Sequence, residues 1–293
     1  MKTNHRNDAI TSATTRSGRG GSGGTASPRA RAPGARRRVS GNKAPTFIDI
    51  FSGVGGFRLG MERAGAECAL SVERDPHCRR TYLAWFPRTA PDFPSDIRDL
   101  DPASLPEHDV LCAGWPCPPF SVAGVSRRNS LGQAHGFRDP EQGDLFFYVA
   151  DAIAAKRPKA FLLENVPHLL AHDEGRTWRR VAGTLTGLRY AVCRKVIDAS
   201  VFVPQRRKRL FIVGFDAKRY GREPRFRWPI LTGDSAPTMR DILIDAGEHP
   251  DEIERCTLDD RGWHCLLQHR EKHKASGNGF GYGLVDEDGV SRT

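Results

Sequence analysis

Residues 47–65, FIDIFSGVGGFRLGMERAG, hold the clearest structural pattern in this chain of 293 residues. The stretch begins as a short apolar, β-rich run, passes through a glycine-rich turn, and continues as a helical pattern that ends at Gly65. Glycines between a strand and a helix let the backbone approach a ligand near the helix N-terminus. The stretch therefore predicts a strand–turn–helix unit able to bind a ligand, although tight turns also use glycine for purely structural reasons.

Apolar runs and helical patterns go on alternating from Thr46 to about residue 215. Strands are expected at CALSV (68–72), VLCA (110–113), AFLL (160–163), YAVCRKVI (190–197) and RLFIVG (209–214), and helices at DPHCRRTYLAW (75–85) and DLFFYVADAIAAKR (144–157). This alternation predicts an α/β fold with a doubly wound, mostly parallel sheet covered by helices on both faces. After Trp228 the pattern gives way to polar, loop-rich sequence.

The net charge of +10 is concentrated in an N-terminal segment. Residues 1–45 contain ten of the 45 lysines and arginines and one of the 35 acidic residues, so the rest of the chain has 35 basic and 34 acidic side chains. This Gly/Ser/Arg/Pro-rich segment has too few large apolar groups to fold, and we expect a disordered basic tail. It can hold a polyanion loosely by counterion release, or it can be a dispensable leader.

Cysteine usage and hydropathy indicate a chain of the cytoplasm. The seven cysteines are odd in number and form no CxxC pair, which favours reduced thiols over a disulfide framework or a metal site. No apolar run approaches the ~18 residues of a membrane span. No apolar signal-peptide region follows the N-terminus.

Two acidic residues follow the glycine-rich turn in the order that a nucleoside-binding site requires. Glu73, in SVERD, ends the second strand, where a carboxylate can bind both ribose hydroxyls. Asp96, in SDIRD, is expected to follow a third strand, where it can accept a hydrogen bond from an adenine amino group. Glu73 alone is most simply a solvated carboxylate, but the turn, Glu73 and Asp96 in that order favour a nucleoside cofactor. The turn lacks the full GxGxxG of dinucleotide sites, and the chain has no GxxxxGK[ST].

A second group of residues has the chemistry of a nucleophile and its helpers. Cys117 lies between prolines in AGWPCPPFSVAG (113–124), so a stiff loop presents its thiol at the carboxyl end of a strand. Glu164 ends the AFLL strand at the same sheet edge, and Arg207 and Arg209 are expected on one face of an entering strand. The simpler alternatives are a small buried hydrophobe for the cysteine, a helix cap or surface acid for Glu164, and a solvated basic cluster.

Taken in order, these segments resemble the DNA (cytosine-5)-methyltransferases of the bacterial type. DIFSGVGGFRLGMERAG is similar to the cofactor loop of that family, VERD to its ribose-binding acid, SDIRD to its adenine-binding segment, AGWPCPPFSVAG to its Pro-Cys nucleophile loop, and ENV and QRRKR to its two remaining catalytic signatures. The resemblance runs from about residue 46 to residue 215. One departure is Pro118, where many members carry glutamine, while Pro116, Phe120 and Ser121 keep the rest of the loop pattern.

The resemblance implies a Rossmann-like methyltransferase that transfers a methyl group from S-adenosyl-L-methionine to carbon 5 of a flipped-out cytosine in duplex DNA. It implies that the Cys117 thiolate adds to C6 while protonated Glu164 supports N3. It also implies that Arg209 holds the base carbonyl and that Arg207 orders the loop and the phosphates. The segment 121–143 is expected to be the mobile loop that flips the base. The implied cofactor-binding residues are Phe51, Gly53, Val54, Gly55, Gly56, Glu73, Asp96, Ile97, Pro116 and Leu145.

The expected domains are a basic tail at 1–45, a catalytic domain at 46–220 and a partial target-recognition region at 221–293. Because members of the family continue past that region, we expect a truncated chain that methylates little unless a partner chain supplies the rest. Double-stranded DNA and the cognate endonuclease of a restriction–modification system are the other implied partners. Two alternatives stay open, namely an inactive nucleic-acid-binding relative and an RNA cytosine-5 methyltransferase on the same scaffold.

Overall fold

The computed structural model describes residues 43–89, 93–116, 121, 126, 136–138, 144–231, 236–245, 247–277 and 285–292. The chain divides into two units, Met1–Asn42 and Lys43–Thr293, and every described residue belongs to the second unit. The predicted basic tail therefore lies almost wholly outside the described residues, and its disorder stays a prediction. The described part of the chain contains no helix that is long and apolar enough to cross a membrane.

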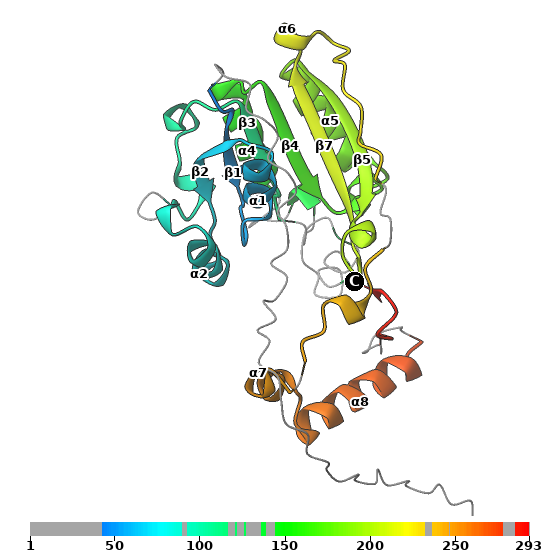
Figure 1. The fold of residues 1–293 in the computed structure, drawn as a ribbon. Coiled ribbons are helices and arrows are strands. Elements are labelled where there is room, and N and C mark those ends of the chain that lie inside the picture. Colours follow the sequence, from blue (N-terminus) through cyan, green and yellow to red (C-terminus); the bar gives the residue numbers. More distant parts are fainter. Residues whose placement is uncertain are drawn as a thin grey trace, which may run out of the picture. The chain divides into compact units, whose positions relative to one another are not determined.

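A six-stranded sheet forms the centre of the second unit (Figure 1). Its strands lie in the order β2-β1-β3-β4-β7-β5, with the bounds β1 Thr46–Ile50, β2 Glu67–Val72, β3 Val110–Ala113, β4 Ala160–Asn165, β5 Tyr190–Asp198 and β7 Lys208–Asp216. β1 pairs in parallel with β2 and β3, and β3 pairs in parallel with β4, whereas β7 is antiparallel to both of its neighbours. The sheet is thus mostly parallel, as predicted, with one reversed strand.

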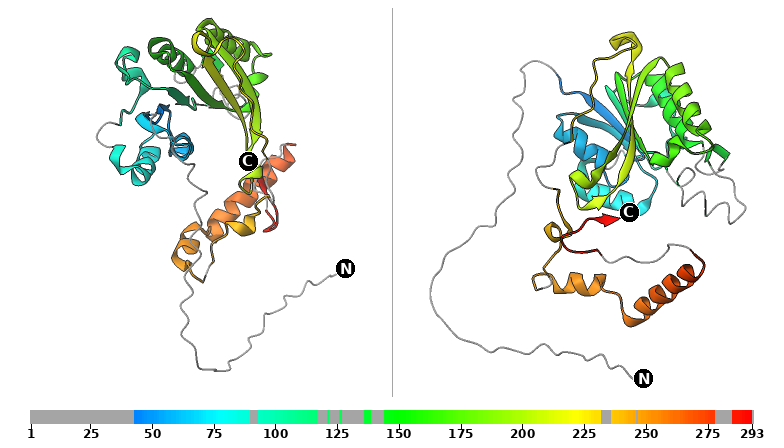
Figure 2. Two further views of the ribbon diagram at one scale, coloured as in Figure 1. Left: turned by 45° about the horizontal axis from the view of Figure 1, so that its top comes forward. Right: turned by 90° about the vertical axis from the view of Figure 1, so that its right-hand side faces the viewer.

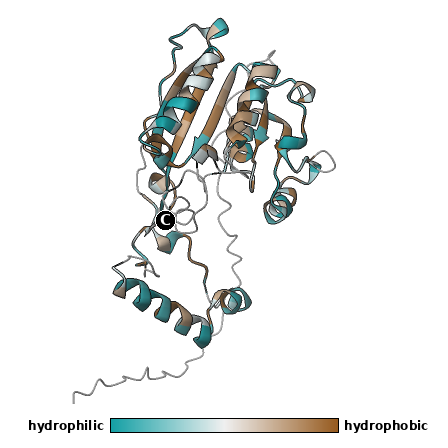
Figure 3. Cartoon of the chain, turned by 180° about the vertical axis from the view of Figure 1, so that it is seen from behind, coloured by the Kyte–Doolittle hydropathy of each residue, from teal (hydrophilic) through white to brown (hydrophobic). Residues whose placement is uncertain are grey.

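Helices cover both faces of this sheet (Figure 2). Their bounds are α1 Gly56–Arg63, α2 Pro76–Trp85, α4 Leu145–Lys156 and α5 Arg176–Gly187. Successive strand residues point to opposite faces, so Ile48 and Ile50 share a core cluster with α4 and α5, while Phe47 packs with Phe57 and Met61 of α1. The central strands are mostly apolar (Figure 3), as a sheet buried between two helical layers requires, although β1 also holds the buried Asp49. The predicted doubly wound α/β fold is confirmed.

The connection from β5 to β7 departs from the predicted strand–helix alternation. The short 3-10 turn Ala199–Val201 and the two-residue strand β6, Gln205–Arg206, take the place of a crossover helix in this described stretch. Without a crossover, the chain reverses and β7 pairs antiparallel with β5 along its full length. The reversed strand is the physical result of that short connection.

A second prediction is wrong near Asp96. In the described chain between β2 and β3 there is no strand, only α2 and the 3-10 turns Pro87–Thr89, Ile97–Asp99 and Pro102–Ser104. Asp96 instead caps the turn Ile97–Asp99, because its carboxylate accepts a hydrogen bond from the backbone N–H of Arg98. The position of Asp96 is therefore set by this capped turn, which follows α2 in the sequence, and not by the end of a strand.

The C-terminal part contains more helix than the sequence suggested. It includes α6 (Ala217–Tyr220), α7 (Pro250–Cys256), the 16-residue helix α8 (Asp260–Ala275) and β8 (Ser291–Arg292). Asp259 caps α8 by accepting from the N–H of Gly262, and basic residues fill the last turn, but α8 buries no residue. A helix without a buried face has a weak apolar period, which explains why the loop-rich prediction failed there. β8 pairs in parallel with β6, the short strand that precedes β7 in the sequence.

Candidate active site

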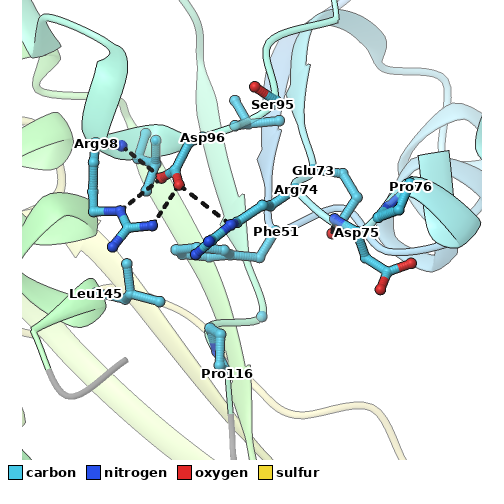
Figure 4. A pocket seen from close by; sticks show the side chains of 13 residues that line it. Phe51, Glu73, Arg74, Asp75, Pro76, Ser95, Asp96, Arg98, Pro116 and Leu145 are labelled. Atoms are coloured by element: carbon cyan, nitrogen blue, oxygen red, sulfur yellow. Dashed lines mark hydrogen bonds and ion pairs between the residues drawn. The ribbon is translucent and has the colours of Figure 1, made fainter. Parts of the chain in front are cut away.

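The carboxyl ends of the parallel strands meet at one edge of the sheet, and a pocket of about 520 Å³ lies there (Figure 4). Residues that follow β1, β2 and β3 contribute to it, together with the turn around Asp96 and the start of α4. The lining residues are Phe51, Val72, Glu73, Arg74, Asp75, Pro76, Ser95, Asp96, Ile97, Arg98, Gly114, Pro116 and Leu145. This is the position at which open α/β sheets bind ligands.

Six of the ten predicted cofactor-binding residues line this pocket, and they are Phe51, Glu73, Asp96, Ile97, Pro116 and Leu145. The four residues of the glycine-rich turn, Gly53, Val54, Gly55 and Gly56, are not among the lining residues. The turn acts on the pocket indirectly, since the N–H of Gly53 donates to Oε2 of Glu73 at 2.8 Å. Their predicted contact with a cofactor stays a prediction.

Both carboxylate oxygens of Glu73 are held by the backbone. Oε2 accepts from Gly53, and Oε1 accepts from the N–H of Asp75 at 2.7 Å. Each carboxylate oxygen has two lone pairs, so both oxygens can still accept from a ligand. Glu73 is thus an oriented acceptor at the rim of the pocket, suited to a pair of hydroxyl groups.

Asp96 is the second oriented acid of the pocket. Arg98 reaches it with two guanidinium nitrogens, Nε at 3.0 Å from Oδ1 and Nη2 at 2.6 Å from Oδ2. These hydrogen bonds hold the pKa of the Asp96 carboxyl below its usual range, so the group is an anion. Arg74 lies on the same carboxylate, with its Nε 3.7 Å from Oδ2. Sequence reasoning missed both arginines, and no signal beyond their places in SDIRD and VERD marks them.

Asp75 and Ser95 also line the pocket, and much of the remaining wall is apolar. Val72, Ile97 and Leu145 are buried, and Phe51 and Pro116 are half-buried. Apolar walls with a few oriented polar groups are typical of small-molecule sites. An adenosyl group fits this set, because it offers a flat base to the apolar wall, two hydroxyls to Glu73 and an amino group to Asp96. The residues present therefore suit S-adenosylmethionine.

A second part of the site lies around Glu164 at the end of β4. Burial raises the pKa of the Glu164 carboxyl above its ordinary value, although Arg209 and Arg207 act in the opposite direction. Arg209 lies with its Nε 2.9 Å from Oε1 of Glu164. The Oε2 atom would lie 3.3 Å from a Cβ placed on Gly114, which puts the carboxyl beside the loop that leaves β3. The site thus contains a carboxyl of raised pKa, Glu164, next to the positively charged Arg209.

The loop that leaves β3 is tied to the end of β4. The buried Asn165 donates from Nδ2 to the carbonyl oxygen of Trp115 at 3.1 Å. This bond holds the loop at Trp115 beside the end of β4, where Glu164 also lies. Cys117, the predicted nucleophile, lies outside the described residues, as do Pro118 and Phe120. Its role stays a prediction.

The two predicted arginines differ in their placement. Arg209 belongs to β7 as expected, but Arg207 lies before the strand, between β6 and β7. The N–H of Arg207 donates to Oδ1 of Asp198 at 3.1 Å, because the chain is still turning from β5 into β7 at that point. The prediction that both arginines lie on the strand is therefore wrong for Arg207, whose side chain is exposed.

Most of the predicted mobile loop, 121–143, lies outside the described residues. Its described turn, Gly136–Arg138, packs on the helices of the sheet. The ring of Phe137 lies 5.3 Å from that of Phe147, and the Arg180 guanidinium lies 5.1 Å from the Phe137 ring. The loop thus has an anchored point close to the start of α4, while its mobility stays a prediction.

Comparison with known proteins identifies the family. The family described as C-5 cytosine-specific DNA methylase matches residues 45–291. A DNA-cytosine methyltransferase of Escherichia coli K12 is 39% identical over 280 aligned residues, which cover 84% of this chain and 58% of that protein. The Type II methyltransferase M.NlaX of Neisseria lactamica is 38% identical, with 83% of this chain and 72% of that protein covered. The chain belongs to the C-5 cytosine-specific DNA methylase family, as predicted.

Solved structures agree on the fold. The S. pombe Dnmt2 methyltransferase aligns with a TM-score of 0.54 over 85% of this chain and 70% of that chain, at 14% identity. A putative DNA modification methyltransferase encoded within an E. coli prophage aligns with a TM-score of 0.52 over 85% of this chain and 82% of that chain, at 19% identity. The fold is thus the Rossmann-like fold of S-adenosylmethionine-dependent methyltransferases. The chain spans little more than half the length of the E. coli relative.

Proposed function

We propose that this protein transfers a methyl group from S-adenosylmethionine to carbon 5 of cytosine in duplex DNA. The observation that carries the proposal is the half-buried Glu164 carboxyl, which is paired with Arg209 beside the loop that leaves β3 and close to a pocket suited to an adenosyl group. Membership of the methylase family and the names of its bacterial relatives support the same reaction.

The chemistry requires a cytosine ring made electron-rich at carbon 5. In the proposed reaction the Cys117 thiolate adds to C6, and Glu164 donates its proton to N3, which places the electron pair at C5. When bound, S-adenosylmethionine would supply the electrophilic methyl group, and S-adenosylhomocysteine would leave with the electron pair of the broken S–CH3 bond. A base then removes the proton from C5, the C5–C6 double bond re-forms, Cys117 leaves as a thiolate, and N3 returns its proton to Glu164.

Arg209 and Arg207 have separate tasks in this proposal. Arg209 of β7 lies next to the Glu164 carboxyl at the end of β4. It can therefore orient this carboxyl and hold the carbonyl oxygen of the base. Arg207 is exposed before the strand and can contact a phosphate of the DNA backbone. A base within a duplex cannot reach Cys117, so the proposal includes flipping of the cytosine.

Relatives named Type II methyltransferases favour a restriction–modification setting for this chain, with a cognate endonuclease in the same system. Methylation of the host sites would then protect them from that endonuclease. Bisulfite sequencing of DNA from a methylase-deficient bacterium that expresses the chain would identify the modified cytosines.

The test in vitro is the transfer of tritiated methyl groups to duplex DNA and, in parallel, to transfer RNA. We expect weak transfer to DNA, in line with the little methylation expected of this chain alone, and its loss in Cys117→Ala. This variant should still bind S-adenosylhomocysteine, because the thiol acts on the base. Transfer to RNA alone would favour the RNA alternative. Transfer to neither substrate, or measurable turnover by Cys117→Ala, would contradict the proposal.

A further inference from the structure

The two arginines on Asp96 contact it in different ways (Figure 4). Arg98 forms a fork on both oxygens, and its backbone N–H donates to Oδ1 at 3.1 Å. Arg74 comes no closer than 3.7 Å, through one nitrogen to Oδ2. The Arg74 side chain is 70% exposed, against 32% for Arg98. Only Arg98 therefore makes hydrogen bonds that define the orientation of the carboxylate.

The fork has a geometric consequence for Asp96. The terminal torsion of an aspartate side chain has a broad energy minimum, so a carboxylate held at one point can rotate. A planar guanidinium that binds both oxygens fixes the plane of the carboxylate as well as its position. The Asp96 side chain is 16% exposed, so solvent weakens this ion pair less than it would at an open surface.

The fork also leaves a defined acceptor. A carboxylate has about four lone-pair directions, two on each oxygen. Among the described contacts, Oδ1 accepts from Nε and from the backbone N–H of Arg98, while Oδ2 accepts from Nη2. Oδ2 therefore accepts one hydrogen bond among the described contacts and can accept a second, since Arg74 approaches it only to 3.7 Å. An anionic acceptor takes a hydrogen bond from an amino group and repels a carbonyl oxygen at the same place.

We propose that Arg98 is the positioning residue for purine selection in this pocket. Its fork holds Asp96 so that Oδ2 accepts from the exocyclic amino group of an adenine and rejects a purine that carries a carbonyl there. The proposal rests on the proposed function, since it takes the ligand to be an adenosyl cofactor. Arg98 acts through Asp96 and makes no direct contact with the reacting atoms.

The test compares two ligands that differ in one group. S-adenosylhomocysteine carries the amino group, and S-inosylhomocysteine carries a carbonyl in its place. Calorimetric titration of the whole chain is expected to show preference for the first ligand. In Arg98→Gln we expect this preference to fall by about tenfold, which corresponds to 1.4 kcal/mol. Arg98→Lys keeps the charge without the fork, so its preference should resemble that of Arg98→Gln.

Arg74→Gln is the matched control, because it removes a charge near the same oxygen but leaves the fork in place. Its ratio of the two dissociation constants should change less than that of Arg98→Gln. An equal fall in both variants would assign the effect to charge and overturn the positioning role, as would an unchanged ratio in Arg98→Gln. If that variant fails to fold, Arg98→Lys decides the question. A wild-type chain that binds neither ligand would instead contradict the adenosyl site itself.

Discussion

The Glu164 carboxyl gives the proposed reaction a pH dependence of definite sign. Burial raises its pKa, and the opposing effect of Arg209 and Arg207 is smaller. The protonated acid therefore persists to a higher pH than it would on an exposed glutamate. As the pH rises through the raised pKa, the acid is lost, so we expect kcat for methyl transfer to fall on the alkaline side.

Glu164→Gln removes the transferable proton while keeping the shape of the side chain. We expect a loss of roughly 100-fold or more in kcat, the range in which general acids contribute, and the loss of the alkaline limb assigned to Glu164. Tritium transfer to duplex DNA across a pH series measures both. Glu174→Gln, at an acid that is 81% exposed, is the matched control. A Glu164→Gln variant with the wild-type rate and profile would remove Glu164 from the mechanism.

Glu73 combines a contact with the glycine-rich turn and a place in the pocket. Glu73→Ala should weaken the binding of S-adenosylhomocysteine by roughly 1.5–3 kcal/mol for each charge-assisted hydrogen bond lost to the ribose. Calorimetry measures the change, and Glu67→Ala, at an exposed acid that begins β2, is the control. An unchanged dissociation constant in Glu73→Ala would show that Glu73 does not bind the ribose.

Individual residues of the pocket were predictable where their neighbours in sequence define them. Glu73 follows an apolar strand, and Leu145 begins an apolar helix, so their places at the sheet edge follow from chain order. Arg98 and Arg74 were not predictable, because their role depends on Asp96 being between them in space. In the sequence alone, a basic residue next to an acidic one indicates no more than a solvated ion pair.

At the level of elements, the turn before α1 makes a sharp prediction at Gly55. Its φ is +96°, and a Cβ there would lie 2.5 Å from Cε2 of Phe86. We expect Gly55→Ala to destabilise the fold by about 1–3 kcal/mol, through backbone strain and this clash. Gly60→Ala, inside α1 and with nothing within 4 Å of its Cβ, should stabilise it by about 0.5–1 kcal/mol. Urea unfolding measures both, and equal effects of the two changes would contradict the argument.

The strands of the large sheet and the helices α1, α2 and α4 were predicted from local patterns, because each packs an apolar face or run on its neighbours, whereas α5 was not predicted. The connection between β5 and β7 was not, because strand direction is decided by long-range pairing. The helix α8 was missed for the opposite reason, since it buries nothing and so shows little apolar period. The strand expected before Asp96 was inferred only from the regular alternation of strands and helices, and no local apolar run supported it.

For the whole molecule, the composition of the N-terminal segment gives the next prediction. Deletion of residues 1–44 should leave the Tm unchanged, because the segment lacks the apolar groups to form a core. The cut keeps Pro45, whose carbonyl accepts from the N–H of Glu67 at 2.8 Å. Thermal denaturation of the full and shortened chains measures this, and a clearly lower Tm in the shortened chain would show that the tail packs on the folded unit.

The reversed strand β7 also sets an order for assembly during synthesis. It is the last strand of the large sheet to leave the ribosome, yet it occupies an interior position between β4 and β5. Until it is made, the nascent chain exposes an unpaired edge of β4, and β5 has no partner in the sheet, which invites association with other chains. β5 and β7 are close in sequence, so we expect them to pair first as a hairpin and then to dock on β4 as a unit.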